Sequence, residues 1–185
     1  RPSAGSDRGG LTVDYFDNRE LAGKPVHQEI INSPRLIWMG DEPAPGVRGG
    51  DFSARVHGTF VADVDGLHTF ALVTGGTGGR VSIDGTVVLD NFDHQERGSA
   101  FFGLGSAELR TTVECRAGDE LELVAEYVSF EGLAVGALLL GHLPPIADDG
   151  IARAVAAAAS SDVAVVVVGL NQDSETEGED RASMQ

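Results

Sequence analysis

The sequence predicts a mainly β protein, a β-sandwich or barrel that is followed by a helix–strand–loop fragment of an α/β domain. Between residues 11 and 143, short apolar or alternating runs are separated by Gly, Asp and Asn. Pro144-Pro145 ends this pattern, and an Ala-rich run with high helix propensity follows over residues 151–159. The β-branched run from Val163 to Leu170 comes next and is typical of a parallel strand buried on both faces.

These changes in pattern divide the chain into three segments. Residues 1–9 are rich in Gly, Ser and Pro without periodicity, which indicates a linker. Residues 10–145 form the β domain. Residues 146–185 form an incomplete α/β fragment, because the chain reaches Gln185 before a second strand of that kind.

The strands of the β domain follow from alternation and from turn residues. The expected strands cover residues 11–16, 52–61, 67–73, 80–83, 86–90, 109–114, 120–128 and 133–140. In the second of them Phe52, Ala54 and Val56 share one face. Asp84-Gly85 lies between two β-branched runs, and this pair predicts a tight hairpin because Gly accepts the positive φ that such turns need.

Charge and composition exclude some classes of partner. Acidic residues outnumber basic ones by 29 to 13, which gives a formal net charge of −16. A surface with this much negative charge repels the phosphate backbones of nucleic acids and anionic lipid headgroups. We therefore expect neither nucleic acid nor membrane as a partner. Neutral sugars remain possible ligands, and a homo-oligomer is compatible with the sequence. The composition fits a cytoplasmic and a secreted bacterial protein equally well.

Two residue types occur only once and are expected to be structural. Cys115 is the single cysteine, so no disulfide can form within the chain, and its alternating surroundings predict a buried side chain. Trp38 follows Pro34 and precedes a loop rich in Pro and Gly. We expect it to be a partly buried anchor.

Four stretches of the β domain resemble the PA14 domain family. They are Gly10-Leu-Thr-Val-Asp-Tyr-Phe, Phe52-Ser-Ala-Arg-Val-His-Gly-Thr-Phe, Asp65-Gly-Leu-His-Thr-Phe and Val81-Ser-Ile-Asp-Gly-Thr-Val-Val-Leu-Asp-Asn. These stretches mark core strands and one turn. The resemblance therefore implies a PA14-like fold, and it does not by itself imply a chemistry.

The tail, Ser161 to Arg181, resembles the second domain of family 3 glycoside hydrolases. There an apolar strand leads into a loop of the form Glu-x-Glu-Gly-x-Asp-Arg, which matches residues 175–181 here. Some β-glucosidases of that family carry a PA14 domain inserted just before such a strand. The resemblance implies a retaining β-glucosidase that hydrolyses terminal non-reducing β-D-glucosyl residues and needs no cofactor.

The same resemblance assigns the general acid/base to Glu177. Retaining glycosidases use two carboxyl groups about 5–5.5 Å apart, one as nucleophile and one as acid/base. Like charges at Glu175 and Glu179 would raise the proton affinity of Glu177, as a general acid requires. The family's nucleophile is an Asp in a barrel domain, which would be part of the remaining polypeptide. We therefore expect the 185-residue chain alone to be inactive.

The acidic loop has two other interpretations, a solvated loop without chemistry and a metal site. Alternate acidic residues from Asp173 to Glu179 resemble a calcium loop superficially, but the Gly and Glu positions of an EF-hand are missing. Some PA14 lectins hold calcium with adjacent aspartates. Here the only such pair, Asp148-Asp149, lies at the start of the Ala-rich run, where helix capping is expected. We therefore expect no metal site.

The best candidate for sugar contacts within the β domain is the loop over residues 91–103. Its aromatic side chains can stack on sugar rings, and its polar ones can bond hydroxyl groups. We expect substrate contacts from Phe92, Arg97, Phe101 and Phe102, with Asp93, His94 and Gln95 as further hydrogen-bonding groups. Because Phe101 and Phe102 are adjacent, one of them should be exposed.

Two other functions remain open. The β domain could be a lectin-like carbohydrate-binding module without catalysis, in which case it would bind sugar by itself. It could also be a structural spacer, whose removal would change stability and leave specificity unchanged.

Overall fold

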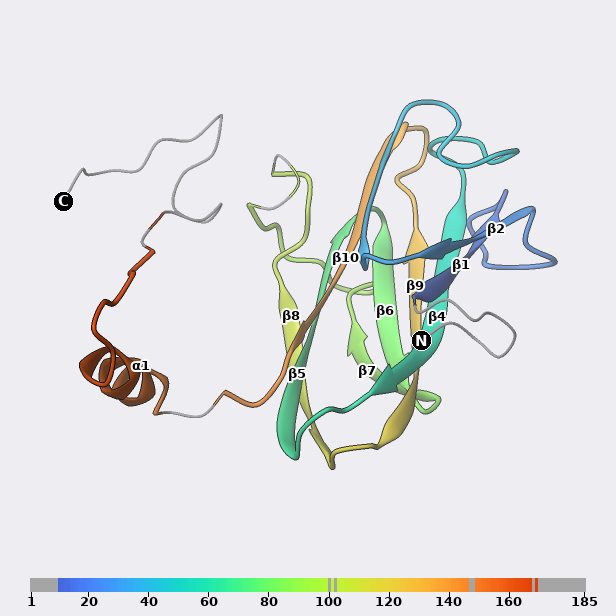
Figure 1. Cartoon of the computed structure of the whole chain (residues 1–185). Helices are drawn as coiled ribbons and strands as arrows, with labels where there is room; N and C mark the ends of the chain where they lie inside the picture. The colour runs from blue at the N-terminus through green and yellow to red at the C-terminus, as the bar shows by residue number, and fades with distance from the viewer. Residues whose placement is uncertain (1–9, 100, 102, 147–148, 168, 170–185) are drawn as a thin grey trace. The chain divides into compact units, whose positions relative to one another are not determined.

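The computed structural model describes residues 10–99, 101, 103–146, 149–167 and 169 (Figure 1). The chain divides into two compact units, Arg1–Pro145 and Ile146–Gln185. The first unit contains ten strands, and the second contains one helix among its described residues. The mainly β prediction is confirmed.

The ten strands form two antiparallel sheets whose facing sides enclose the core (Figure 1). The six-stranded sheet has the order β2-β1-β4-β9-β6-β7, and the four-stranded sheet has the order β3-β10-β5-β8. The strand bounds are β1 Leu11–Phe16, β2 His27–Ile31, β3 Arg35–Met39, β4 Ser53–Val61, β5 Gly66–Gly75, β6 Gly78–Ile83, β7 Thr86–Asp90, β8 Leu109–Cys115, β9 Glu120–Val128 and β10 Val135–Leu143.

The core is built as the alternation predicts. Phe52, Ala54 and Val56 are all buried, as the common face required. Trp38 is more deeply buried than expected, with 5% of its surface exposed, and its indole N–H donates to Tyr15 Oη at 3.3 Å. A buried Trp needs such a partner for its polar edge, and this bond satisfies it. Cys115 is buried, as predicted.

The hairpin between β6 and β7 confirms the Asp84-Gly85 prediction. Both turn residues have positive φ, 48° and 75°, as a two-residue turn of this hand requires. The Asp84 carboxylate also accepts a hydrogen bond from the backbone N–H of Glu122 at 2.8 Å. The turn is therefore tied to the neighbouring strand β9.

The second unit contains the helix α1, Gly150–Ala159, which confirms the helix expected over the Ala-rich run. Asp149 is its N-cap, but its side chain makes no capping hydrogen bond, so the expected capping role is wrong for Asp149. No helix within the described ranges is long and apolar enough to cross a membrane.

The strand predicted from Val163 is wrong for the residues that are described. Residues 163–167 have no regular secondary structure, and the valine side chains there are exposed. A parallel strand exists only when neighbouring strands bond to its backbone, and the described part of this unit supplies none. Val168 and Leu170 lie outside the described residues, as do the linker over residues 1–9 and the acidic loop with Glu177.

Candidate functional site

Five loops meet at one end of the sandwich, because the strands are antiparallel and successive odd-numbered strands all run towards it. The register places Phe16 beside Ser53, Val128 beside Gly78 and Met39 beside Val135. The connections after β1, β3, β5, β7 and β9 therefore lie at this end, which we call the loop end. The opposite end carries short turns and the exit of β10.

The long loop after β7 is anchored at its start by a buried amide. The Asn91 side chain accepts a hydrogen bond from the Gly79 N–H at 2.8 Å and donates to the Thr74 hydroxyl at 3.0 Å. Gln95 Nε2 donates to the same hydroxyl at 2.8 Å. Gln95 was expected to bond sugar hydroxyls; the structure uses one N–H of its amide to attach the loop to β5, and the contact with sugar stays a prediction.

Thr74 also holds the far end of this loop. Its backbone N–H donates to Ser106 Oγ at 3.0 Å, and its carbonyl accepts from the Ser106 N–H at 2.8 Å. Between these anchors Arg97 and Ser106 form an isolated antiparallel bridge. The described part of the loop is thus a closed, hydrogen-bonded structure fixed to β5 and β6.

Phe92 lies directly on the backbone at Gly78. A Cβ at that glycine would approach Phe92 Cδ1 to 2.6 Å, so only glycine allows the ring to lie there. The Arg80 guanidinium lies 5.2 Å from the ring centroid and is held by Asp90 at 2.8 Å. Phe92 is therefore fixed from two sides.

Phe92 forms one wall of a shallow cavity of about 450 Å³ at the loop end, and this cavity is wide open to solvent. A pocket of this size accommodates a small polar ligand, and its lining combines apolar with charged side chains. The lining residues are Arg19, Glu20, Leu21, Thr77, Phe92 and Val128.

Arg19 joins three of the loops and was not predicted from the sequence. Its Nη1 lies 3.0 Å from Glu131 Oε2, and its Nη2 donates to Thr77 Oγ1 at 2.8 Å. The buried Nε has no hydrogen-bond partner within the described residues. The guanidinium is held in place at the cavity wall, because two of its nitrogens are fixed by other loops.

The loop that carries Arg19 has its own internal bonds. Asn18 Oδ1 accepts from the N–H groups of Glu20 and Ala22, at 3.1 and 3.2 Å. Leu21 has a φ of 55°, and its N–H donates to Ser53 Oγ at 3.2 Å. A left-handed leucine persists only where its surroundings fix it, so this wall of the cavity is preorganised.

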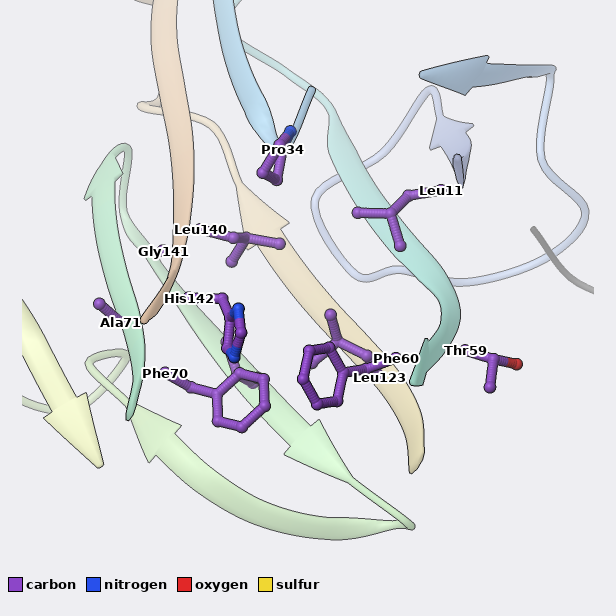
Figure 2. A pocket seen from close by; sticks show the side chains of 11 residues that line it. Leu11, Pro34, Thr59, Phe60, Phe70, Ala71, Leu123, Leu140, Gly141 and His142 are labelled. Carbon is purple, nitrogen blue, oxygen red and sulfur yellow. The ribbon is translucent and has the colours of Figure 1, made fainter. Parts of the chain in front are cut away.

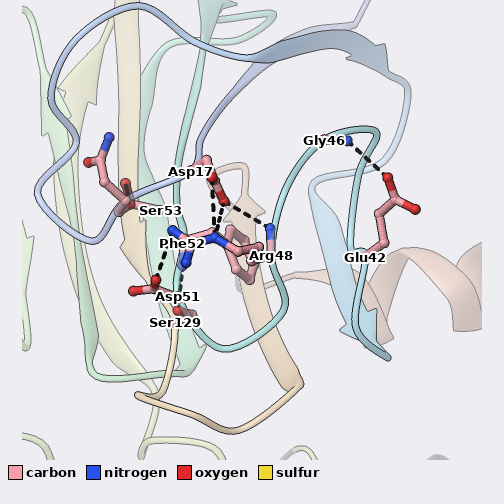
Figure 3. A network of polar contacts seen from close by, with 9 residues as sticks. Asp17, Glu42, Gly46, Arg48, Asp51, Phe52, Ser53 and Ser129 are labelled. Atoms are coloured by element: carbon pink, nitrogen blue, oxygen red, sulfur yellow. Dashed lines mark hydrogen bonds and ion pairs between the residues drawn. The ribbon is translucent and has the colours of Figure 1, made fainter.

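An ion-pair network fastens the neighbouring loop to this one (Figure 3). The Arg48 N–H and Nε both donate to Asp17 Oδ1, at 3.0 and 3.1 Å, and Arg48 Nη2 pairs with Asp51 at 3.0 Å. The backbone N–H of Arg48, and then its guanidinium, lower the pKa of the Asp17 carboxyl. Asp17 therefore stays ionised and keeps the two loops together.

The other predicted contact residues do not line this cavity. Phe101 has a φ of 53°, and its ring lies against Gly75 on the four-stranded sheet. Arg97 is exposed on the loop. Phe102 and Glu177 lie outside the described residues. Of the predicted residues, Phe92 is the one that the structure places on a cavity wall.

A second cavity, of about 190 Å³, lies between the sheets at the opposite end (Figure 2). Its walls are almost entirely apolar, and the rings of Phe60, Phe70 and His142 turn towards one another in it. Such a lining offers few partners for hydroxyl groups. The cavity at the loop end therefore suits a sugar better.

His142 makes the stability of the domain pH-dependent. Its ring N–H donates to His68 Nδ1 at 2.9 Å, since His68 Nε2 faces the Val64 carbonyl at 2.9 Å. Partial desolvation of the ring, and then the neighbouring His68, lower the pKa of His142, against a smaller opposing effect of Asp63.

In the unfolded chain His142 has the ordinary histidine pKa of about 6.5, and in the folded protein its pKa is lower. As the pH falls below about 6.5, the unfolded chain therefore binds more protons at His142 than the folded protein does. We expect the free energy of unfolding to decrease as the pH falls from about 7 to 5. Urea titrations at several pH values measure it. The His142→Asn variant should show a weaker dependence, and His94→Asn, at an exposed position, should follow the parent. Equal slopes for all three proteins would contradict the assignment.

No group of three or more His, Cys, Asp or Glu side chains among the described residues is arranged to hold a metal ion. The carboxylates at the loop end are instead engaged by arginines, as Asp17, Asp51 and Glu131 illustrate. The arrangement can thus contact a neutral polar ligand through one ring, one guanidinium and neighbouring carboxylates.

The two antiparallel sheets and their loops define a β-sandwich module, and comparison with known proteins identifies its family. The model of the PA14 domain matches residues 7–135. The chain belongs to the PA14 domain family.

The relatives that match nearly the whole chain are β-glucosidases. A β-glucosidase of Rhizobium radiobacter is 36% identical over 180 residues, which are 95% of this chain and 22% of that protein. A probable β-glucosidase H of Neosartorya fischeri is 36% identical over 177 residues, 89% of this chain and 20% of that protein. The crystal structure of a β-glucosidase from Kluyveromyces marxianus in complex with glucose matches with a TM-score of 0.81 and 28% identity, over 99% of this chain and 22% of that one. The chain thus spans about a fifth of the length of these relatives.

Proposed function

We propose that the chain is an internal segment of a retaining β-glucosidase that hydrolyses terminal non-reducing β-D-glucosyl residues. In this proposal the PA14 domain shapes the part of the substrate pocket beyond the cleaved bond. The observation that carries it is the cavity between Arg19 and Phe92, which combines the chemistry of a sugar site with a rigid frame. The likeness to β-glucosidases over nearly the whole chain supports the glycoside as substrate.

The cavity can recognise a sugar through complementary contacts. The Phe92 ring offers a flat apolar surface for the C–H face of a pyranose. The carboxylate of Glu20 accepts hydrogen bonds from hydroxyl groups, and the guanidinium of Arg19 donates them. Because hydrogen bonds within the protein fix Arg19 and its loop, little conformational entropy is lost when the sugar binds.

The catalytic part of the proposal concerns Glu177 as the general acid/base. The nucleophile would come from the remaining polypeptide, so cleavage would require the full-length protein. Glu177 lies two residues after Glu175 and two before Glu179, and this clustering of carboxylates favours a protonated form at position 177.

Replacing Phe92 tests the pocket-shaping role. In the full-length protein we expect Phe92→Ala to raise KM for a β-linked glucose disaccharide about fivefold, because a lost ring contact costs about 1 kcal/mol. The KM for methyl β-glucoside, which has almost no aglycone, should change less than about twofold. Steady-state kinetics on both substrates measure the difference.

Val87→Ala is the matched control, since Val87 is an exposed apolar residue on β7 away from this cavity. It should change neither KM. Equal losses on both substrates in the Phe92 variant would contradict a role confined to the aglycone.

A second candidate function is sugar binding without catalysis, and it is favoured by one observation. The cavity is formed entirely by residues of the PA14 domain, from Arg19 to Val128. If the domain acts as a lectin-like module, the 185-residue chain should bind the disaccharide in an NMR titration, and Phe92→Ala should abolish the shifts. The glucosidase proposal instead predicts that aglycone selectivity appears only in the full-length protein.

A further inference from the structure

The outward faces of the two sheets differ in chemistry. The six-stranded sheet presents ion pairs to solvent, with Arg55 2.9 Å from Glu126 and Arg80 2.8 Å from Asp90. Along these strands, charged residues that point outward therefore alternate with apolar residues that point into the core. This pattern is expected for an antiparallel sheet with one solvated face.

In the four-stranded sheet the edge strand β8 keeps this alternation and turns Arg110, Thr112 and Glu114 outward, whereas the other three strands largely lack it. Leu72, Leu138 and Trp38 point into the core, so the residues between them on β5, β10 and β3 point outward. The outward residues in the middle of the sheet are Ile37, Met39, Ala71, Val73, Val135 and Leu139. We call this surface the aliphatic face. Strands that are apolar on both faces are typical of sheets covered on both sides.

The described residues of the domain cover only one margin of the aliphatic face. The Phe101 ring lies over Gly75 there, and Ala137, which pairs with Gly75, is completely buried. Further along the sheet, Ile37 is 42% exposed and Met39 64%. A contiguous apolar surface of this kind marks an interaction site.

We propose that the aliphatic face packs against another part of the same full-length polypeptide, an inference that rests on the proposed function. The chain corresponds to 22% of the length of its Rhizobium relative, so most of such a polypeptide is available to cover it. The central strand β10 of this sheet continues at Leu143 into the second unit, so the polypeptide leaves the domain from the sheet concerned.

This packing would also orient the candidate site. Phe101 belongs to the loop that carries Phe92, and its ring lies at the margin of the aliphatic face. A docked polypeptide would therefore fix the loop through Phe101. In this arrangement Phe101 positions the loop that carries Phe92, and the proposal does not require Phe101 to contact sugar.

Two isoleucines of nearly equal exposure provide the test. Ile37, on the edge strand β3 of the aliphatic face, is 42% exposed, and Ile30, on the edge strand β2 of the other sheet, is 44% exposed. In the full-length protein, Ile37→Cys and Ile30→Cys are treated separately with a maleimide, and modification is followed by peptide mass spectrometry. Each rate is divided by that of the same peptide in denaturant. Cys115 is buried and serves as an internal reference.

We expect the normalised modification rate of Ile37→Cys to be at least about tenfold lower than that of Ile30→Cys. This difference should persist when the protein is diluted a hundredfold. Equal relative rates would overturn the proposal, because the face would then be exposed. Protection that disappears on dilution would also overturn it and would identify a second copy of the protein as the partner. Melting temperatures confirm that both variants fold. No substrate is used, so the outcome is independent of whether the protein proves to be a glucosidase.

Discussion

The Glu177→Gln variant of the full-length protein is expected to lose about 10²–10⁴-fold in kcat on β-glucosides, the usual contribution of a general acid/base. Glutamine keeps the size of the side chain but cannot donate a proton to the leaving oxygen or take one from water. Added azide should restore turnover on substrates with good leaving groups. Such groups leave without protonation, and azide attacks the glycosyl-enzyme without needing a base.

Glu175→Gln is the matched control for this experiment. It removes a neighbouring charge from the same loop, and we expect less than about a tenfold change in kcat because the proton donor is retained. The glucosyl azide formed by Glu177→Gln can be identified by mass spectrometry. A Glu177→Gln enzyme with parental turnover in the absence of azide would remove Glu177 from the proposed role.

Tyr127→Ala is expected to destabilise the domain by about 4–6 kcal/mol. Tyr127 is completely buried, with ring centroids 4.7 Å from Trp38 and 5.7 Å from Phe52, and its hydroxyl donates to the Gly75 carbonyl at 2.9 Å. Truncating a core aromatic costs about 3–5 kcal/mol, and the unpaired carbonyl adds at least about 1 kcal/mol. Since domains are stable by only about 5–15 kcal/mol, a large part of the stability would be lost.

Tyr127→Phe separates the two contributions. It retains the ring and removes the hydroxyl, so we expect a loss of about 1–2 kcal/mol. Urea unfolding followed by the fluorescence of Trp38, the single tryptophan, measures both variants. A loss below about 2 kcal/mol for Tyr127→Ala would show that the aromatic cluster is not the centre of the core.

The sequence predicts the parts of the fold that depend on local pattern. The face shared by Phe52, Ala54 and Val56 and the turn at Asp84-Gly85 need only neighbours in sequence, and both are confirmed. The strands β2 and β3 were not predicted. Their residues are mostly exposed at sheet edges, so they lack the apolar alternation that indicates a strand.

Contacts between distant segments could not be predicted. Arg19 meets Thr77 and Glu131 across 58 and 112 residues, and no spacing within the sequence relates these positions. Gln95 was predicted to be available to a ligand, but its bond to Thr74 arises only when the loop folds onto β5. The run from Val163 has strand composition, yet strand structure requires hydrogen-bonded neighbours from elsewhere in the polypeptide.

The double anchorage at Thr74 has a consequence for transferring this loop to another scaffold. One threonine bonds Asn91 and Gln95 through its hydroxyl and Ser106 through its backbone. A graft of this loop onto another scaffold will keep its shape only if the recipient supplies a hydroxyl at the position of Thr74 and a glycine at the position of Gly79, whose N–H donates to Asn91 Oδ1. Library diversity is best confined to exposed positions such as Arg97 and Ser99, and it must spare Gly98, where a Cβ would meet the Ser106 carbonyl.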